Sequence, residues 1–140
     1  MTEKLYPCLW FNGQAGAAAE FYCSVFKNSR ILSDTPLVVT FEINGTKFMG
    51  LNGGPDFRFN EAVSFVVSCE TQDEIDYYWE KLTEGGEESM CGWLKDKFGV
   101  SWQIIPFNIV ELMSEPEKAK RVTQAFMNMR KLDIETLMNA

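Results

Sequence analysis

Histidine is missing from all 140 residues of this chain. Without an imidazole, the chain cannot form a Ser-His-Asp or Cys-His catalytic group, an HExxH zinc site, or the facial triad of two histidines and a carboxylate. A bound metal ion would need ligands from Asp, Glu, Gln or Cys, and the sequence contains no evident cluster of these residues. We therefore expect no metal and no cofactor.

Positive charge is also scarce. The chain has 13 Lys and Arg but 20 Asp and Glu, which gives a net charge of −7 and an isoelectric point near 4.6. Binding to phosphate groups needs clustered Lys and Arg, whereas the basic residues here are scattered. The composition therefore argues against nucleic acid or an anionic membrane as the main partner.

Paired cysteine motifs and long apolar runs are absent as well. The shortest spacing between cysteines is the 15 residues from Cys8 to Cys23, so no CxxC motif exists. No run of about 18 apolar residues could span a membrane, and the start of the chain, MTEKLYPCLWF, does not resemble a secretory signal. We expect a cytoplasmic protein with reduced thiols.

The residues that are present describe a globular chain, with 46% hydrophobic and 14% aromatic residues. Its most informative stretch is CGWLKDKFGVSWQIIP, residues 91–106, which predicts a β-hairpin that turns at Phe98 and Gly99. Alternation places Ser101, Gln103 and Ile105 on one face of the last strand and Val100, Trp102 and Ile104 on the other. Gln103 is the only long polar side chain on its face, so its amide needs a partner or a ligand.

The order of predicted elements occurs twice. Strands at 5–11, 30–33, 37–43 and 46–51 surround a helix at 15–26, and strands at 61–68, 87–93, 94–97 and 100–106 surround a helix that starts near Thr71. The segment EFYCSVF aligns with DYYWEKL at an offset of 56 residues. We predict an α+β fold of two βαβββ modules, residues 1–56 and 57–107, in one domain that spans residues 1–140.

Residues 108–140 form a third part, which is predicted to be helical and rich in methionine. Thr71 with Glu74, and Ser114 with Glu117, fit the capping box of a helix N-terminus, and Asp133 fits an N-cap. Two interpretations of these C-terminal helices remain open: they pack on the chain's own sheet, or they bind a partner.

Three segments resemble a known family: LWFNGQAGAAAEFYCSVFKNS at 9–29, FMGLNGGPDFRFNEAVSFVVSCETQDEIDYYWEKL at 48–82, and the hairpin stretch at 91–106. Together they resemble the PhnB-like branch of the vicinal oxygen chelate superfamily, which includes glyoxalase I, extradiol dioxygenases and bleomycin-resistance-like proteins. The resemblance implies a C-terminally extended glyoxalase/bleomycin-resistance fold, with an open U-shaped mixed sheet around a cavity, and a homodimer.

The resemblance also supplies three alternatives for function. Superfamily enzymes hold a divalent ion with a final-strand Glu, which maps onto Gln103, and with residues that map near Leu5 or Pro7 and near Val63, where no ligand side chain stands. The superfamily's metal enzymes make a metal-dependent lyase, isomerase or dioxygenase one alternative, and the missing ligand side chains favour metal-free binding as another. Relatives often carry a 3-demethylubiquinone methyltransferase label, but the GxGxG turn of a typical methyltransferase is missing.

The leading hypothesis is a protein that binds a small, partly apolar molecule in the cavity that the resemblance implies. Strand parity and polarity select the candidate ligand-binding residues Phe11, Met49, Asn52, Phe65, Trp93, Ser101 and Gln103, while Trp10 and Trp102 are expected to point away. The other interpretation is a filled core in which Gln103 bonds to the backbone. No catalytic residue can be assigned, and a protein-interaction module that uses the helical tail remains an alternative.

Overall fold

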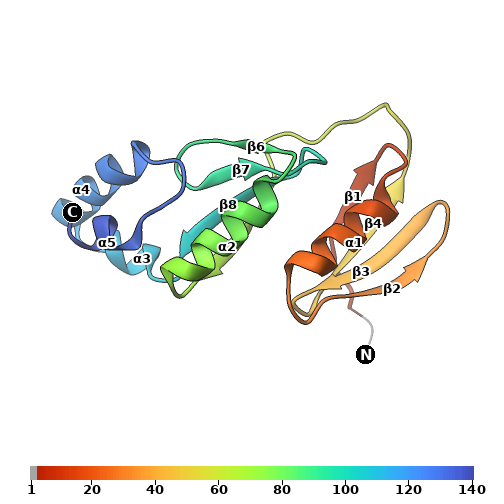
Figure 1. Ribbon diagram of the computed structural model, residues 1–140, viewed down its shortest axis with the longest axis horizontal. Helices are drawn as coiled ribbons and strands as arrows, with labels where there is room; N and C mark the ends of the chain where they lie inside the picture. The colour runs from red at the N-terminus through yellow and green to blue at the C-terminus, as the bar shows by residue number, and fades with distance from the viewer. Residues whose placement is uncertain (1–2) are drawn as a thin grey trace. The chain divides into compact units, whose positions relative to one another are not determined.

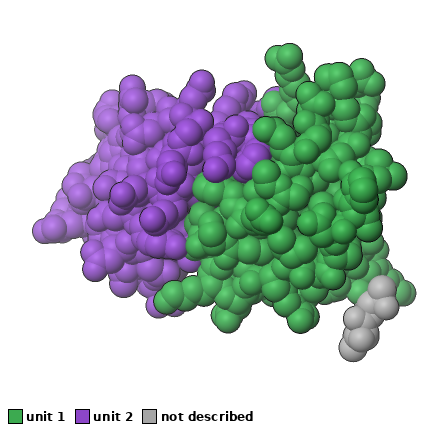
Figure 2. All heavy atoms as spheres, turned by 45° about the vertical axis from the view of Figure 1, so that its right-hand side comes forward, with its two compact units in different colours: residues 1–59 green, residues 60–140 purple. Residues whose placement is uncertain are grey.

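The structure is a computed structural model that describes residues 3–140. The chain divides into two compact units, residues 1–59 and 60–140, which Figure 2 shows in green and purple. The division after Phe59 lies in the same connecting loop as the module boundary expected at residue 56. In the described part of the chain, no helix is long and apolar enough to cross a membrane.

The first unit contains a four-stranded mixed sheet and one helix (Figure 1). Its elements are β1 (Cys8–Phe11), α1 (Ala15–Val25), β2 (Arg30–Asp34), β3 (Val38–Ile43) and β4 (Thr46–Asn52), and the strand order is β1-β4-β3-β2. Strand β1 runs parallel to β4, and the other pairs are antiparallel. The buried ring of Tyr22 on α1 lies 6.2 Å from that of Phe41 on β3, so the helix covers one face of the sheet.

The second unit repeats this arrangement. Its elements are β5 (Ser64–Cys69), α2 (Gln72–Thr83), β6 (Glu87–Glu88), β7 (Trp93–Lys95) and β8 (Ser101–Pro106), in the strand order β5-β8-β7-β6. Strand β5 is parallel to β8, and α2 packs on β7 and β8. The buried apolar side chains of α2 are Ile75, Trp79 and Leu82. The predicted α+β fold of two βαβββ modules is confirmed.

Several local predictions need correction. The strand predicted at 87–93 is only Glu87–Glu88, because Cys91 and Gly92 adopt positive φ values of 61° and 81° and turn the chain. The N-cap of the helix after Ser114 is Glu115, without a side-chain cap, and the Ser114 hydroxyl donates to the Glu111 carbonyl instead. The Thr71 and Asp133 caps are confirmed.

The turn between β7 and β8 is built around the carboxylate of Asp96, which is only 2% exposed. One carboxylate oxygen accepts from the backbone N–H of Phe98 at 2.9 Å and of Val100 at 3.1 Å, and the other accepts from Trp102 Nε1 at 2.9 Å. These bonds satisfy a buried charge and fix the Trp102 indole beneath α2. Asp96 therefore sets the register with which β8 leaves the turn.

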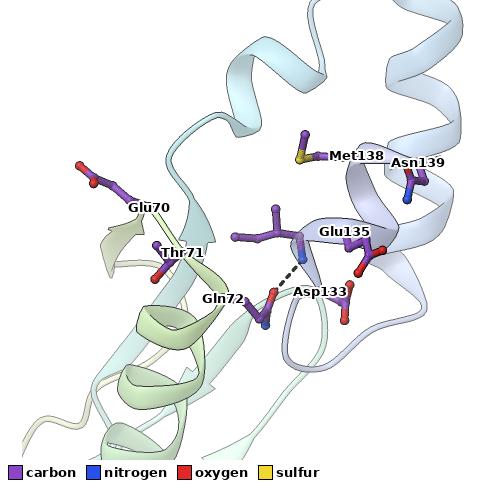
Figure 3. Close-up of a pocket in the computed structure, with 8 residues that line it drawn as sticks. Glu70, Thr71, Gln72, Asp133, Glu135, Met138 and Asn139 are labelled. Carbon is purple, nitrogen blue, oxygen red and sulfur yellow. Dashed lines mark hydrogen bonds between the residues drawn. The ribbon is translucent and has the colours of Figure 1, made fainter.

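The C-terminal helices α3 (Ile109–Leu112), α4 (Pro116–Met127) and α5 (Ile134–Met138) have a small core of their own, made by Leu112, Val122, Leu132 and Leu137. The segment between α4 and α5 also docks on the second unit. Gln72 Nε2 donates to the Leu132 carbonyl at 3.0 Å, and Gln72 Oε1 accepts from Ile134 N at 2.8 Å, the bond dashed in Figure 3. Within the second unit, the tail is thus packed on its own chain.

We predict that Asp96→Ala lowers the free energy of unfolding by about 3 kcal/mol, because the substitution leaves buried donors without an acceptor. Urea denaturation followed by tryptophan fluorescence measures this change. Asp56→Ala, at an exposed loop position, is the matched control and should change stability by less than about 0.5 kcal/mol. Equal stability of the two variants would show that the turn does not depend on the Asp96 carboxylate.

We predict that Gln72→Leu releases the tail, because the leucine side chain keeps the size of Gln72 but loses the two bonds to the 132–134 segment. The backbone amides of residues 129–138 should then exchange with solvent faster, with a loss of about 2 kcal/mol in local stability. Gln124→Leu, at an exposed position of α4, is the control. Unchanged exchange in Gln72→Leu would mean that the tail core alone holds these residues.

Candidate ligand-binding site

The face of the second sheet that α2 does not cover carries the candidate residues. Cross-strand pairing places Ser64 beside Ser101 and Ser101 beside Lys95, and it places Val66 beside Gln103 and Gln103 beside Trp93. Residues that pair across neighbouring strands point to the same face. Trp93, Ser101 and Gln103 are therefore brought together as predicted, on the face opposite Trp102 and Ile104.

A cavity of about 500 Å³ opens beside this hairpin, and we call it the hairpin cavity. Its lining consists of Glu61, Glu87, Glu88, Ser89, Met90, Cys91, Trp93, Leu94, Lys95 and Ser101. The volume falls in the range of small-molecule sites, roughly 300 to 1,000 Å³. All of the lining residues belong to the second unit, so that unit supplies this site by itself.

Ser101 is the unusual member of this lining. The residue is 1% exposed, and its hydroxyl is one of two buried side-chain polar atoms without a hydrogen-bond partner in the described part of the chain; the other is Asn108 Oδ1. A buried polar group without a partner costs about 1 to 3 kcal/mol. A ligand atom in the cavity could supply the missing bond.

The amide nitrogen of Gln103 has a partner within the protein. Its Nε2 donates to Ser64 Oγ at 2.9 Å, so its partner is a side chain rather than the backbone or ligand considered from the sequence. Ser101, the cross-strand neighbour of Ser64, makes no side-chain hydrogen bond to it. On this face the buried polar atom without a partner is the Ser101 hydroxyl, whereas the amide nitrogen of Gln103 is bonded.

Charged side chains lie around the same cavity. Lys95 pairs with Glu61, and this hydrogen bond and the attraction of the opposite charges raise the pKa of Lys95 and lower the pKa of Glu61. Glu88 accepts from Trp79 Nε1 at 2.5 Å and lies 3.8 Å from Arg130. These charged groups are exposed or half-exposed, so their pairing adds little to stability but shapes the local potential.

The loop that lines the cavity is held by the tail. Cys91 N donates to the Met129 carbonyl at 2.7 Å, and Gly92 N donates to the Arg130 carbonyl at 2.8 Å. A Cβ atom at Gly92 would lie 2.9 Å from the Ile104 carbonyl oxygen and 3.1 Å from Leu132, so only glycine fits there. The tail therefore helps to position one wall of the hairpin cavity.

Four predicted placements differ from the structure. Phe11 is 2% exposed beside Ala15 and Gly50, on the face that α1 covers, and Phe65 packs on Trp102 at 5.5 Å, on the face that α2 covers. Asn52 caps α1, because its Oδ1 accepts from Ala15 N at 2.9 Å. Trp10 was expected to point away from the open face, but it lies on it.

Three of these differences, those of Phe11, Phe65 and Trp10, have one cause. In the first sheet, pairing puts Met49 and Trp10 on the face without a helix, while Phe11 lies beside Asn52 on the other face. The parity assigned from the sequence was shifted by one residue in β1 and β5, and a one-residue shift moves every side chain of a strand to the opposite face. Met49 keeps its predicted place on an open face of the first unit.

Sequence reasoning missed Lys95 and the loop residues Met90 and Cys91, which line the hairpin cavity. Lys95 could have been found, because it lies two residues after Trp93 and therefore shares its face. The loop residues could not, because the path of the loop depends on the positive φ values of Cys91 and Gly92 rather than on alternation.

A second cavity, of about 510 Å³, lies between the start of α2 and α5 (Figure 3). Several of its polar side chains already serve the two helices: Thr71 Oγ1 accepts from Glu74 N, Asp133 Oδ1 accepts from Thr136 N, and Gln72 holds the tail. Helix capping and tail docking therefore account for these polar residues without a ligand. The hairpin cavity is the better candidate site.

The donor groups do not fit the divalent ion of the superfamily. Across residues 3–140, no three His, Cys, Asp or Glu side chains lie close enough together to hold a metal. Gln103, at the position of the final-strand ligand, has its amide nitrogen bonded to Ser64. Hard cations require several oxygen ligands, which this face does not supply.

Comparison with known proteins agrees with this architecture. A family described as 3-demethylubiquinone-9 3-methyltransferase matches residues 3–105. The PhnB protein of Bacillus cereus, which carries the same description, is 35% identical, with 74% of this chain and 99% of that chain covered and a TM-score of 0.68. No curated protein matches this chain.

More distant structures share the fold. The fosfomycin resistance protein FosX from Listeria monocytogenes, solved with Mn(II) and sulfate, is 15% identical over 74% of this chain and 89% of its own, with a TM-score of 0.53. A glyoxalase-related enzyme from Fulvimarina pelagi is 14% identical over 75% of this chain and 88% of its own, with a TM-score of 0.54.

The protein therefore has the glyoxalase fold of the vicinal oxygen chelate superfamily. Within that superfamily, the chain belongs to the PhnB-like family described as 3-demethylubiquinone-9 3-methyltransferase. The family match ends at residue 105, so helices α3 to α5 lie beyond it.

We predict opposite results for two serines on the same sheet face. Ser64→Ala should lower the free energy of unfolding by about 1 kcal/mol, because Gln103 loses its acceptor. Ser101→Ala should leave it unchanged or raise it by up to about 1 kcal/mol, because the substitution removes a hydroxyl without a partner. Urea denaturation of both variants measures the difference, and an equal loss in both would mean that the Ser101 hydroxyl is bonded in the folded protein.

Proposed function

We propose that the protein binds a small, partly apolar molecule in the hairpin cavity. The observation that carries the proposal is the buried Ser101 hydroxyl, which lines the cavity and lacks a partner. Folding leaves such a group unpaired at a cost, and function is a common reason for retaining it. A hydrogen-bonding atom of a ligand would complete the site.

The other lining residues support the same kind of ligand. Trp93 and Met90 offer an aromatic and a flexible apolar surface, and the exposed fraction of Met90 is 43%. Lys95 and Glu61 add polar groups at the same cavity. A few polar groups among apolar ones are typical of pockets that orient small molecules.

A metal-dependent lyase, isomerase or dioxygenase is the enzymatic alternative, and it is supported by the fold shared with FosX, which was solved with Mn(II). The donor groups described above argue against it in this chain. Methyl transfer, named by the family description, is a further alternative. A typical methyltransferase binds its cofactor at a glycine-rich turn after the first strand of a doubly wound sheet. The two sheets described here do not have that topology, so methyl transfer is less well supported.

The proposal also covers the oligomeric state of the protein and its cellular compartment. We propose a cytoplasmic homodimer, which is supported by four free cysteines and by an edge strand in each sheet, β1 and β5, with one side unpaired within its sheet. An interaction role for the tail is less well supported, because its methionines Met113 and Met129 pack on the tail core.

A thermal-shift screen of small molecules tests the binding proposal. A ligand present at 100 times its Kd should stabilise the folded protein by about 2.7 kcal/mol, so true ligands raise Tm in a concentration-dependent manner. The shift should be smaller in Ser101→Ala and Trp93→Ala, and it should be unchanged in the control Ser24→Ala, which alters an exposed serine of α1. Ligands that stabilise all of these variants equally would place binding elsewhere and overturn the proposal.

Metal analysis of the purified protein separates this proposal from the enzymatic alternative. We expect less than stoichiometric divalent metal after gel filtration, and no change in Tm when EDTA is added. A tightly held ion at one per chain, with a fall in Tm in EDTA, would support the metal-dependent enzyme instead.

A further inference from the structure

The hairpin cavity has an excess of negative charge. Three of its lining residues are the carboxylates of Glu61, Glu87 and Glu88, and one, Lys95, is a cation. The chain as a whole carries a net charge of −7, so the surrounding field has the same sign. This negative potential would repel an anionic ligand and attract a cationic one.

The three carboxylates are not equally engaged. Lys95 bonds to Glu61, while Trp79 Nε1 donates to Glu88 and Arg130 lies 3.8 Å from it. The Glu87 side chain makes no hydrogen bond or ion pair with another described residue, although its charge contributes to the raised pKa of Lys95, its cross-strand neighbour on β7. Its carboxylate is therefore the one most open to a positively charged group.

Two further lining residues complement a cation that carries an apolar body. The Trp93 side chain shares the open sheet face with Lys95 and Ser101, and an indole face attracts ammonium groups. The Ser101 hydroxyl lies at the same cavity and can accept or donate one hydrogen bond. The lining thus combines negative charge, an aromatic surface and an unpartnered hydroxyl.

We propose that the ligand of the hairpin cavity is a small organic cation: a protonated amine on an aromatic or short apolar body that also bears a hydrogen-bonding group for Ser101. This inference rests on the proposed function and names its ligand class. The carboxylate of Glu87 selects the charge, and Ser101 recognises the polar group at the other end of the ligand.

Matched probes that share a phenol and differ in the end group, and so in charge, test the class. Tyramine, tyrosol and 4-hydroxyphenylacetate share a phenol and carry a positive, a zero and a negative charge, and isothermal titration calorimetry at low salt compares their Kd values. We expect tyramine to bind about fivefold more tightly than tyrosol and at least tenfold more tightly than 4-hydroxyphenylacetate. The advantage of tyramine should shrink as NaCl is raised, because exposed charges are screened.

Variants assign the two roles. Glu87→Gln should remove most of the preference for tyramine over tyrosol, whereas Glu84→Gln, which makes the same charge change at the exposed end of α2 and outside the lining, should keep it. Ser101→Ala should weaken tyramine and tyrosol by about fivefold each, and it should leave phenethylamine, which lacks the phenol hydroxyl, unaffected.

The outcomes distinguish a failure of this inference from a failure of the small-molecule binding on which it rests. Equal or tighter binding of tyrosol or 4-hydroxyphenylacetate, still weakened by Ser101→Ala, would overturn the cationic ligand class and leave small-molecule binding intact. A charge preference that survives Glu87→Gln would overturn the role of Glu87. No binding by any of the probes at millimolar concentration would overturn the ligand class, and the ligand screen described above would then decide small-molecule binding separately.

Discussion

The hydrogen bonds to the Asp96 carboxylate are the constraint on which the second module depends. They tie the backbone of the β7–β8 turn and the indole of Trp102 to one buried charge. With the turn fixed, β8 pairs with β7 in a single register, and the same register carries Ser101 and Gln103 to the face that α2 leaves open. The candidate site is therefore a consequence of a turn whose own residues, 96–100, lie outside its lining.

Much of the fold could be predicted from the sequence. Hydrophobic patterning located α1, α2 and the two strands of the β3–β4 hairpin, and a weak internal repeat gave the βαβββ order. Periodicity reports which residues alternate but not which face of a strand meets a helix, and this explains why Phe11 and Phe65 were assigned to the wrong side. The turn at Cys91 and Gly92 was missed, because Cys91 is a residue type that rarely adopts positive φ.

The candidate site was predictable only in part. The face shared by Trp93, Ser101 and Gln103 followed from alternation along the hairpin. Which of the polar residues is left without a partner did not follow, because that depends on Ser64, which is 39 positions away in sequence from the Gln103 that bonds to it. Three-dimensional pairing, rather than residue type, separates the bonded amide from the unbonded hydroxyl.

The attachment of the cavity loop to the tail has a consequence for divergence within the family. Two carbonyl groups of the tail, at Met129 and Arg130, hold the amides of Cys91 and Gly92, and the family match stops well before those carbonyls at residue 105. Insertions, deletions or substitutions in the tail can thus reshape one wall of the hairpin cavity while the sheet stays unaltered. The shape of the cavity can therefore change among relatives without any mutation of the strands themselves.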